Sequence, residues 1–330
     1  MITRLEIGID ISEEWFDACF LMGKKPPVER FANDDAGRKA FLERVRSFCA
    51  KTVHLAMEHT GGCETALALA GHEASFVVSL LDGLKVARYR ESLGRTVAKN
   101  DREDARLIAR YLRERKPARW SPQPQEYRVL TELVRHRTDL IETRKAWLCR
   151  TRKAPLSELV AAQRDCLLQV LNAQIKDLEK EIAQHIERSA VLNEAVELLL
   201  SVPGIGKVSA VRILAEMGPV ENYATPRQLA LAAGLCPIEN QSGKSKPQGR
   251  LIVYGNRELR NALYMPALVA VREKTALADY AKRIHGNAVK AKKTVLVAVM
   301  RKLACVLHGI LTHKKPYDPI LLLKHMKTKN

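Results

Sequence analysis

Hydrophobic positions in the first 82 residues follow two periods in turn. Runs of mostly apolar residues predict strands, whereas apolar residues spaced three or four apart predict helices. The predicted strands span 5–11, 15–22, 28–32, 52–57 and 75–81. The predicted helices span 34–50 and 64–71, and a third begins at Asp101. The N-terminal part of the chain is therefore expected to form an α/β domain.

The pattern changes after a proline-containing linker at 113–125. From 127 to about 200 the chain has almost no glycine, and apolar stripes on either side of Pro155 predict two long helices. Such a pair is typical of an antiparallel or intermolecular coiled coil. The first of these helices is rich in basic residues, namely Arg135, Arg137, Arg144, Lys145, Arg150, Arg152 and Lys153. A solvated helix face explains some of them, but so much positive charge with few acids favours an arm that faces RNA or DNA.

A short motif over 202–207 joins two further predicted helices and resembles a helix-hairpin-helix. Pro203 and Gly204 end the first helix, and Gly206 lets a phosphate approach the N–H groups that begin the second at Lys207. Backbone contacts of this kind bind nucleic acid without reading its sequence. A plain tight turn between helices is the alternative. The remaining chain is mostly helical in pattern, so we expect a helical C-terminal domain.

Four acidic residues stand where these elements would bring functional groups together. Asp10 and Glu58 each end a predicted strand, and Asp101 and Asp104 lie three apart, on one face of a predicted helix. Three strands, a helix, a strand, a helix and a strand is the order of a ribonuclease H-like fold, whose sites gather at the carboxyl ends of strands. Four such carboxylates can hold Mg²⁺ through oxygen ligands. The helical pair could also simply favour a helix N-terminus, but the ordered set of four is more specific.

The charge of the chain indicates a polyanionic partner. Lysine and arginine number 55 against 37 aspartate and glutamate residues, which gives a net charge of +18 and a pI near 9.7. Nucleic acid is the usual partner of so basic a protein, although a ribosome-associated or membrane-surface protein would have a similar charge. The basic segment 85–99 fits either a solvated surface or contacts with phosphate.

Cysteine usage and the chain's N-terminus indicate the compartment. Seven scattered cysteines form no Cys-x-x-Cys pair, so neither a zinc site nor a disulfide framework is expected, and a reducing cytoplasm fits. Residues 1–6 run into a predicted strand without a signal-peptide pattern. No apolar run is expected to reach the length of a membrane span. We therefore expect a cytoplasmic protein without a membrane partner.

Seven motifs in a fixed order carry a resemblance to a known family. They are Gly8-Ile9-Asp10, Glu58, Asp101-x-x-Asp104-Ala-Arg, Pro203-Gly-Ile-Gly, Ala233-Gly-Leu-x-Pro237, Ser242-Gly243 and Leu259-Arg-Asn-Ala-Leu-Tyr-Met-Pro266. In this combination the sequence resembles the DEDD transposases of the one-ten insertion-sequence family, the bridge-RNA-guided recombinases. The resemblance implies a ribonuclease H-like (RuvC-like) catalytic domain over 1–115 and a linker with a coiled-coil dimerisation region over 116–195. It also implies a transposase domain over 196–330, with the helix-hairpin-helix and a nucleophilic serine.

The resemblance assigns roles to single residues. Asp10, Glu58, Asp101 and Asp104 match the four acids that bind Mg²⁺. Ser242 matches the nucleophile that forms a phosphoserine link with DNA, although the sequence alone would not choose it over Ser245 in the same loop. We expect nucleic-acid contacts from the hairpin, the serine loop and the arm, at Gly204, Gly206, Lys207, Gly243, Lys244, Arg135 and Arg144.

The partners implied by the resemblance are donor and target DNA, a noncoding bridge RNA that selects sites by base pairing, and further copies of the chain. In a homodimer or homotetramer, the acids of one protomer would act with the serine of another. The protein would work in the bacterial cytoplasm, at the nucleoid. Two other functions are open. A metal-only DEDD nuclease or junction resolvase would use the four acids with water as nucleophile, and a non-catalytic DNA-bridging protein would use only the hairpin and coiled coil.

Overall fold

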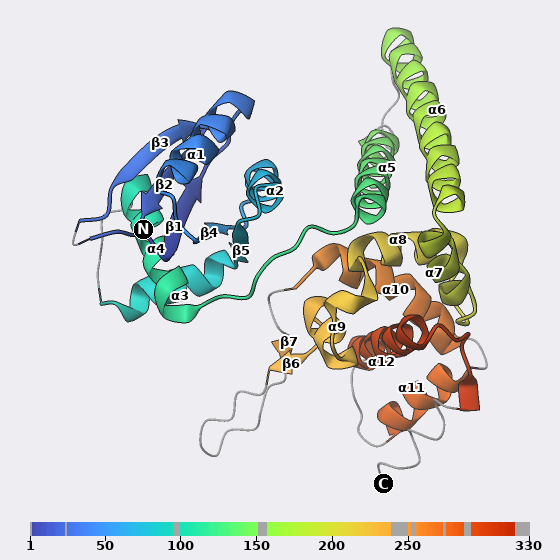
Figure 1. Ribbon diagram of the computed structural model, residues 1–330. Helices are drawn as coiled ribbons and strands as arrows, with labels where there is room; N and C mark the ends of the chain where they lie inside the picture. The colour runs from blue at the N-terminus through green and yellow to red at the C-terminus, as the bar shows by residue number, and fades with distance from the viewer. Residues whose placement is uncertain are drawn as a thin grey trace. The chain divides into compact units, whose positions relative to one another are not determined.

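A computed structural model describes the chain over residues 2–23, 25–94, 100–150, 157–238, 250–251, 255–272, 275–286 and 292–320 (Figure 1). The chain forms two compact units, unit 1 over residues 1–122 and unit 2 over residues 123–330. The predicted division into three domains stays a prediction, and helices from both sides of residue 195 pack within unit 2.

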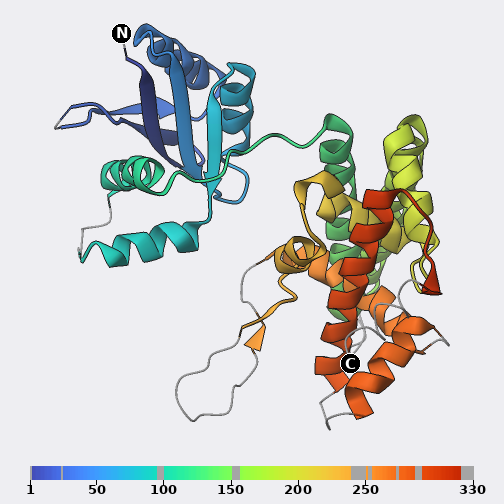
Figure 2. The same cartoon turned by 60° about the horizontal axis from the view of Figure 1, so that its bottom comes forward.

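Unit 1 is built on a mixed five-stranded sheet with the strand order β3–β2–β1–β4–β5 (Figures 1 and 2). β1 runs antiparallel to β2 and parallel to β4; β2–β3 is antiparallel and β4–β5 parallel. The strands are β1 (Arg4–Ile11), β2 (Trp15–Phe20), β3 (Val28–Ala32), β4 (Thr52–Glu58) and β5 (Val77–Leu81). The predicted α/β order is confirmed, and the mixed sheet is consistent with a ribonuclease H-like fold.

Helices cover both faces of this sheet, so residues on both sides of its central strands are buried. The helices are α1 (Asp35–Ser47), α2 (Thr65–Glu73), α3 (Gly83–Ser92) and α4 (Asp101–Arg115). Phe41 of α1 and Leu67 of α2 are buried against one face, and Val86 of α3 and Ile108 of α4 are buried against the other. The first part of the basic segment 85–99 is thus helix α3, while residues 95–99 lie outside the described residues.

The chain leaves unit 1 through a segment that is bonded to the edge of the sheet. The backbone N–H of Trp120 donates to the carbonyl oxygen of Val78 at 2.7 Å. The buried Ser79 hydroxyl donates to the carbonyl oxygen of Ala118 and lies 2.8 Å from Nε2 of His54. Burial and the charge of Arg4 lower the pKa of His54 to about 4, so the ring is neutral and donates to the serine.

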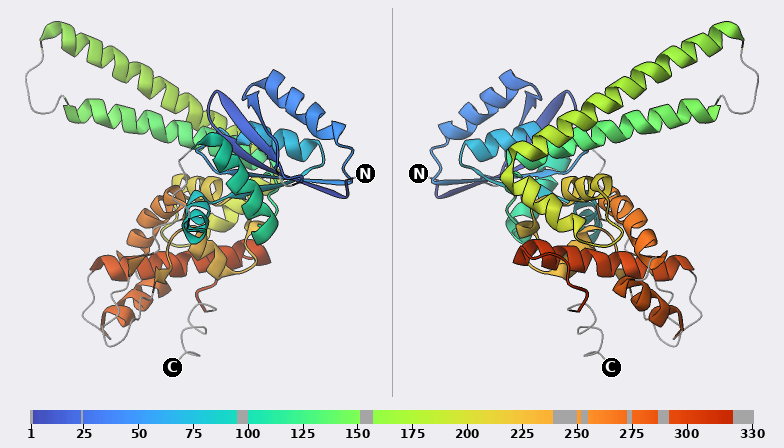
Figure 3. Two further views of the ribbon diagram at one scale, coloured as in Figure 1. Left: turned by 90° about the vertical axis from the view of Figure 1, so that its left-hand side faces the viewer. Right: turned by 90° about the vertical axis from the view of Figure 1, so that its right-hand side faces the viewer.

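Unit 2 begins with two long helices, α5 (Gln125–Arg150) and α6 (Glu158–Arg188), which lie side by side and run in opposite directions (Figure 3). We call this pair the helical arm. Its base belongs to the core of unit 2, where Val134 and Ile182 are buried. Farther along, apolar residues are exposed to solvent, including Leu159, whose exposed fraction is 68%.

The second helix of the arm is shorter than its apolar pattern predicts. We expected it to continue to about residue 200, but it ends at Arg188 and a separate helix, α7 (Ala190–Leu200), follows. The break is at Ser189, whose backbone is extended and whose hydroxyl accepts from the N–H of Leu192. A serine in this position favours a new helix start over a continuous helix. The prediction was wrong because the apolar spacing is the same on both sides of the break.

The other elements of unit 2 pack around one large core. They are α8 (Lys207–Met217), η1 (Val220–Asn222), α9 (Pro226–Ala232), β6 (Pro237–Ile238), β7 (Arg250–Leu251), α10 (Arg257–Arg272), α11 (Ala276–Gly286) and α12 (Lys292–His313). The mostly helical C-terminal region is confirmed.

The expectation that no apolar run reaches the length of a membrane span is wrong for α12. This helix is long and apolar enough by length and composition. Half of the qualifying stretch is buried inside unit 2, however, and Val299, Leu303 and Leu307 belong to its core. A buried core helix can be as long and as apolar as a membrane span, so length and composition do not distinguish the two.

Candidate functional site

Two of the four predicted acids lie on the face of the sheet that α4 covers, and the other two lie on α4 itself. Side chains alternate along a strand, so Asp10 of β1 and Glu58 of β4 point away from the face covered by α1 and α2. β1 and β4 are parallel neighbours, which brings their carboxyl ends together. Asp101 is the first residue of α4, and Asp104 lies one turn further along.

The charges of these acids act on one another. Burial and the negative charges of Asp104, Asp101 and Glu58 raise the pKa of Asp10 to about 7. Burial is the largest cause of this shift, and the three negative charges add to it. The acids therefore influence one another electrostatically, and their action as one metal site stays a prediction.

Gly8 makes this arrangement possible, because α4 lies directly on β1. A Cβ atom at Gly8 would lie 2.5 Å from the carbonyl oxygen of Ala105 and closer still to the backbone nitrogen of Ala109. Both alanines are fully buried. Three small residues thus let a helix backbone touch a strand backbone, and the first turn of that helix carries Asp101 and Asp104.

Replacing Gly8 by alanine is expected to destabilise the protein by about 3 kcal/mol, because the new methyl group meets backbone atoms that cannot move independently. Gly309→Ala is the matched control, since a Cβ there meets no atom within 4 Å and alanine favours a helix. Urea denaturation monitored by circular dichroism compares the two. Equal stabilities of the two variants would show that α4 does not depend on this close approach.

Two arginines pair with the acids on α4, and sequence reasoning missed them. Arg90 of α3 contacts Asp104 at 2.6 Å. Arg30 of β3 contacts Asp101 at 3.1 Å and donates to both carboxylate oxygens of Asp17.

Asp17 is itself a missed residue: it lies directly opposite Asp10 in the β1–β2 register, and its side chain is buried. Its charge also contributes to the raised pKa of Asp10. One signal was present in the sequence, because Asp17 is the only charged residue in the otherwise apolar strand 15–20.

The donor set fits a divalent cation by its chemistry. It consists of carboxylate oxygens alone, and a cation would relieve the repulsion that raises the pKa of Asp10. Within the described ranges, no three His, Cys, Asp or Glu side chains already converge closely enough to hold a metal ion. Arg30 and Arg90 instead neutralise two of the acids. A cation would have to draw Asp101 and Asp104 away from these arginines.

The structure describes the residues of the predicted hairpin in unit 2, and their contact with phosphate stays a prediction. Gly204 has a φ of +88°, and a Cβ there would lie 2.9 Å from the carbonyl oxygen of Pro266, so a side chain would be strained. Gly206 precedes α8, and no side chain caps the N–H groups of that helix's first turn. A Cβ at Gly206 would meet open space, and Lys207 is exposed beside it.

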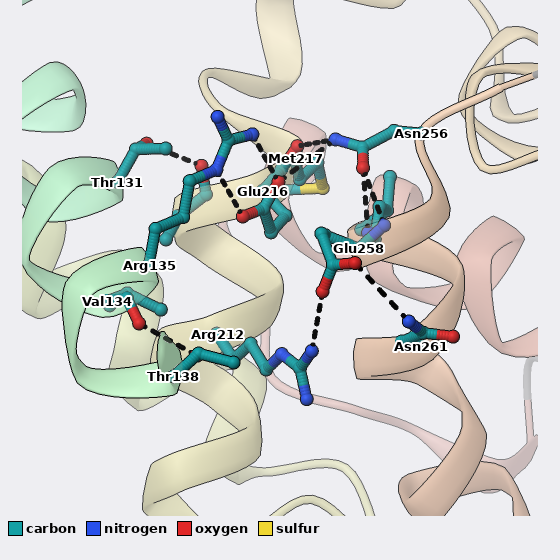
Figure 4. Close-up of polar contacts among 12 residues, drawn as sticks. Thr131, Val134, Arg135, Thr138, Arg212, Glu216, Met217, Asn256, Glu258 and Asn261 are labelled. Atoms are coloured by element: carbon teal, nitrogen blue, oxygen red, sulfur yellow. Dashed lines mark hydrogen bonds and ion pairs between the residues drawn. The ribbon is translucent and has the colours of Figure 1, made fainter. Parts of the chain in front are cut away.

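The two predicted arm residues are both engaged with neighbouring side chains. Arg135 of α5 donates to both carboxylate oxygens of Glu216 in α8, at 2.9 and 2.8 Å (Figure 4). Arg144 donates to Asn172 across the arm at 2.8 Å. The contact with Glu216 accounts for the position of Arg135 without nucleic acid, and its role in binding nucleic acid stays a prediction.

Ser242, Gly243 and Lys244 lie outside the described residues. The structure describes what flanks them. β6 and β7 pair in an antiparallel ladder, and Asn256 caps α10 by accepting from the N–H groups of Glu258 and Leu259.

Two family models match the chain. One, described as a transposase and covering the DEDD transposases of IS110, matches residues 7–159. The other, described as transposase of the IS116/IS110/IS902 family, matches residues 196–282. The first range contains all four acids, and the second contains the hairpin and Ser242.

Curated proteins extend the similarity to nearly the full chain. The pilin gene-inverting protein of Moraxella bovis is 32% identical over 329 residues, which cover 96% of this chain and 98% of that protein. The protein of the same name from Moraxella lacunata is equally similar. A probable family 20 transposase of Pseudomonas aeruginosa is 31% identical over 168 residues, covering 50% of this chain and 48% of that protein.

Proposed function

Since the chain belongs to the IS116/IS110/IS902 family of transposases, it is a DNA transposase or recombinase, and we propose that it works through a serine–phosphate intermediate under the direction of a guide RNA. One structural observation supports this proposal above the others. Burial, together with the negative charges of Asp104, Asp101 and Glu58, raises the pKa of Asp10 to about 7. Acids that only stabilise the fold have no need to lie where burial and neighbouring negative charges disfavour their ionised form, so this arrangement points to a function.

The proposed chemistry starts at the hydroxyl of Ser242. Its oxygen attacks the phosphorus of a DNA phosphodiester, and the new Ser–O–P bond forms as the bond from phosphorus to a deoxyribose oxygen breaks. The departing oxygen takes up a proton and leaves as a DNA hydroxyl. Because one phosphate ester replaces another, attack by a different DNA hydroxyl can release the serine and rejoin strands without ATP.

The acids prepare this step, because a serine hydroxyl is a weak nucleophile at neutral pH. Family membership indicates a divalent metal, and we propose Mg²⁺; when bound, it would lower the hydroxyl's pKa and neutralise charge on the phosphate. Asp10, Glu58, Asp101 and Asp104 would hold it. Without a bound metal ion, Arg30 and Arg90 hold the side chains of Asp101 and Asp104 in place.

The proposed contacts with nucleic acid lie in unit 2. The uncapped first turn of α8 beside Gly206 supports a helix-hairpin-helix that binds a phosphate through backbone N–H groups. The helical arm, as a coiled coil, would join copies of the chain into a homodimer or homotetramer. Arg144 of the arm, with Lys207 and Lys244, would contact donor DNA, target DNA and a bridge RNA whose base pairing selects the sites. The protein would work in the bacterial cytoplasm.

Replacing Asp104 by asparagine tests the role of the acids. We expect cleavage of DNA with Mg²⁺ and flanking RNA to fall by roughly a hundred- to a thousandfold, since a metal ion supplies several kcal/mol and each 1.36 kcal/mol is tenfold in rate. DNA binding, measured by gel shift, should stay within about twofold, because the substitution adds no negative charge.

Glu103→Gln is the matched control for Asp104→Asn, because Glu103 lies in the same helix turn and pairs with Arg106 in its own helix. It should keep wild-type cleavage. Full cleavage by Asp104→Asn would refute the metal-site proposal. Binding without any cleavage by the wild-type chain, with its RNA supplied, would favour the DNA-bridging function.

A further inference from the structure

Unit 2 contains a buried carboxylate that the proposed chemistry does not use. The side chain of Glu216, near the end of α8, is only 2% exposed. Burial alone would raise its pKa, but hydrogen bonds from Arg135 and Asn256 lower that pKa below its usual value, so the group is ionised. Burying a charge is costly unless it is paired and hydrogen-bonded, and such a pair is poor at adding stability compared with apolar packing.

Glu216 joins three helices that are distant in the sequence (Figure 4). Arg135 of α5 binds it through two nitrogens. From the other side, Nδ2 of Asn256 donates to a carboxylate oxygen and to the backbone carbonyl oxygen of Glu216, both at 3.1 Å. Two further bonds brace the same junction: the Thr131 hydroxyl donates to the carbonyl oxygen of Ala215, and Arg212 pairs with Glu258.

Asn256 precedes α10 and follows, in the sequence, the segment 239–254 that contains Ser242. Its backbone N–H donates to the carbonyl oxygen of Ala232 at 2.6 Å. Gly255 before it has a φ of +121°, and a Cβ there would lie 2.6 Å from the backbone nitrogen of Gly234. The position of Asn256 is therefore fixed in three ways: by the close backbone contact of Gly255 before it, by its capping of α10, and by its hydrogen bonds to Glu216.

We propose that Glu216 is a positioning residue that couples the helical arm to the Ser242 segment. Arg135 holds the carboxylate of Glu216 at a fixed distance from α5. Glu216 in turn holds Asn256, which follows the segment that contains Ser242 in the sequence. This inference rests on the proposed function, because it takes Ser242 as the nucleophile. It assigns Arg135 a role other than the nucleic-acid contact expected from its charge.

The test compares two substitutions that do not touch each other. Arg135→Gln breaks the arm side of the junction. Asn256→Ser breaks the segment side but keeps a side-chain oxygen that can cap α10. We expect each variant to form the covalent protein–DNA complex at least about tenfold more slowly than wild type, with RNA binding by gel shift unchanged. Because both changes cut one connection, the double variant should be no slower than the slower single variant.

Two controls separate coupling from loss of folding. Arg188→Gln removes an exposed arginine whose partners, Gln184 and Glu181, lie on its own helix, and it should leave the rate unchanged. Glu216→Gln replaces Arg135→Gln if the latter unfolds, since its neutral side chain leaves no buried charge and Arg135 is 57% exposed. Melting temperatures establish that the compared variants are folded.

The outcomes are distinct for the two proposals. Multiplying effects in the double variant, or folded single variants that react at the wild-type rate, would overturn the positioning role and leave the serine chemistry intact. A wild-type chain that cleaves DNA without any covalent complex would overturn the serine chemistry, and the positioning of Ser242 with it.

Discussion

Replacing Asp10 by asparagine is expected to abolish strand cleavage and yet raise the melting temperature of the protein without added metal. The carboxylate of Asp10 is the one on which burial and the other acids act, and its pKa of about 7 lies well above the ordinary 3.8. Between about pH 4 and pH 7 the unfolded chain releases this proton while the folded chain keeps it. Stability therefore falls as the pH rises through this window, and above pH 7 the full cost remains.

Asparagine cannot ionise, so the variant should lose this dependence on pH. At pH 8 we expect a gain on the order of 2–4 kcal/mol, because one pKa unit corresponds to about 1.4 kcal/mol. The contribution of His54, which loses stability as the pH falls from about 6.5 to 4, is common to both proteins and cancels in the comparison. Thermal denaturation from pH 4 to pH 8 with chelator measures the difference.

A bound metal ion is expected to act in the opposite direction on the melting temperatures of wild type and Asp10→Asn. A divalent cation should raise the melting temperature of the wild-type chain, whose four carboxylates bind it, and should raise that of Asp10→Asn less. Glu13→Gln, a change in the exposed turn after β1, should behave as wild type in both conditions. If Asp10→Asn kept the wild-type slope with pH, the four acids would not form one electrostatic site.

The second large effect is expected from Ser242→Ala. Alanine has no hydroxyl, so the covalent complex should disappear and strand exchange should fall by at least about a thousandfold, as when other enzymes lose their nucleophile. Binding of RNA and DNA should persist, since a serine hydroxyl contributes little to the charge that governs it. Recombination between two plasmid-borne sites in cells and a gel shift in vitro measure the two properties.

Ser245→Ala is the matched control, because it removes a hydroxyl from the same segment. It should recombine DNA at the wild-type rate. Loss of exchange in Ser245→Ala together with normal exchange in Ser242→Ala would move the nucleophile to Ser245. Normal exchange in both single variants and in the double variant would exclude a serine of this segment and favour water as the nucleophile.

Much of unit 1 could be predicted because its apolar runs report burial directly. The large apolar residues of β1 and β4 alternate along each strand, and they are the residues that are buried against α1 and α2. The predicted start of α4 at Asp101 is correct, and Asn100 caps the helix by accepting from the N–H of Arg102. Once these elements were in order, the places of Asp10 and Glu58 followed from the parallel pairing of their strands.

The rest of the candidate site depends on pairs that are distant along the chain. Arg30 and Asp101 are separated by 71 positions, and Arg135 and Glu216 by 81. Nothing in a local pattern distinguishes an arginine that meets an acid from one that meets phosphate, so Arg135 was predicted only as a basic arm residue. The break at Ser189 was missed for a related reason, because the apolar spacing is the same on both sides of it.

The most direct test of the serine chemistry is to identify the residue that carries DNA. Purified protein, flanking RNA and labelled junction DNA are combined with Mg²⁺, the covalent complex is isolated on a denaturing gel, and its peptides are sequenced by mass spectrometry after nuclease digestion. We expect a phosphate-linked nucleotide on Ser242. Cleaved DNA that runs free of protein, or a nucleotide on any other residue, would contradict the account.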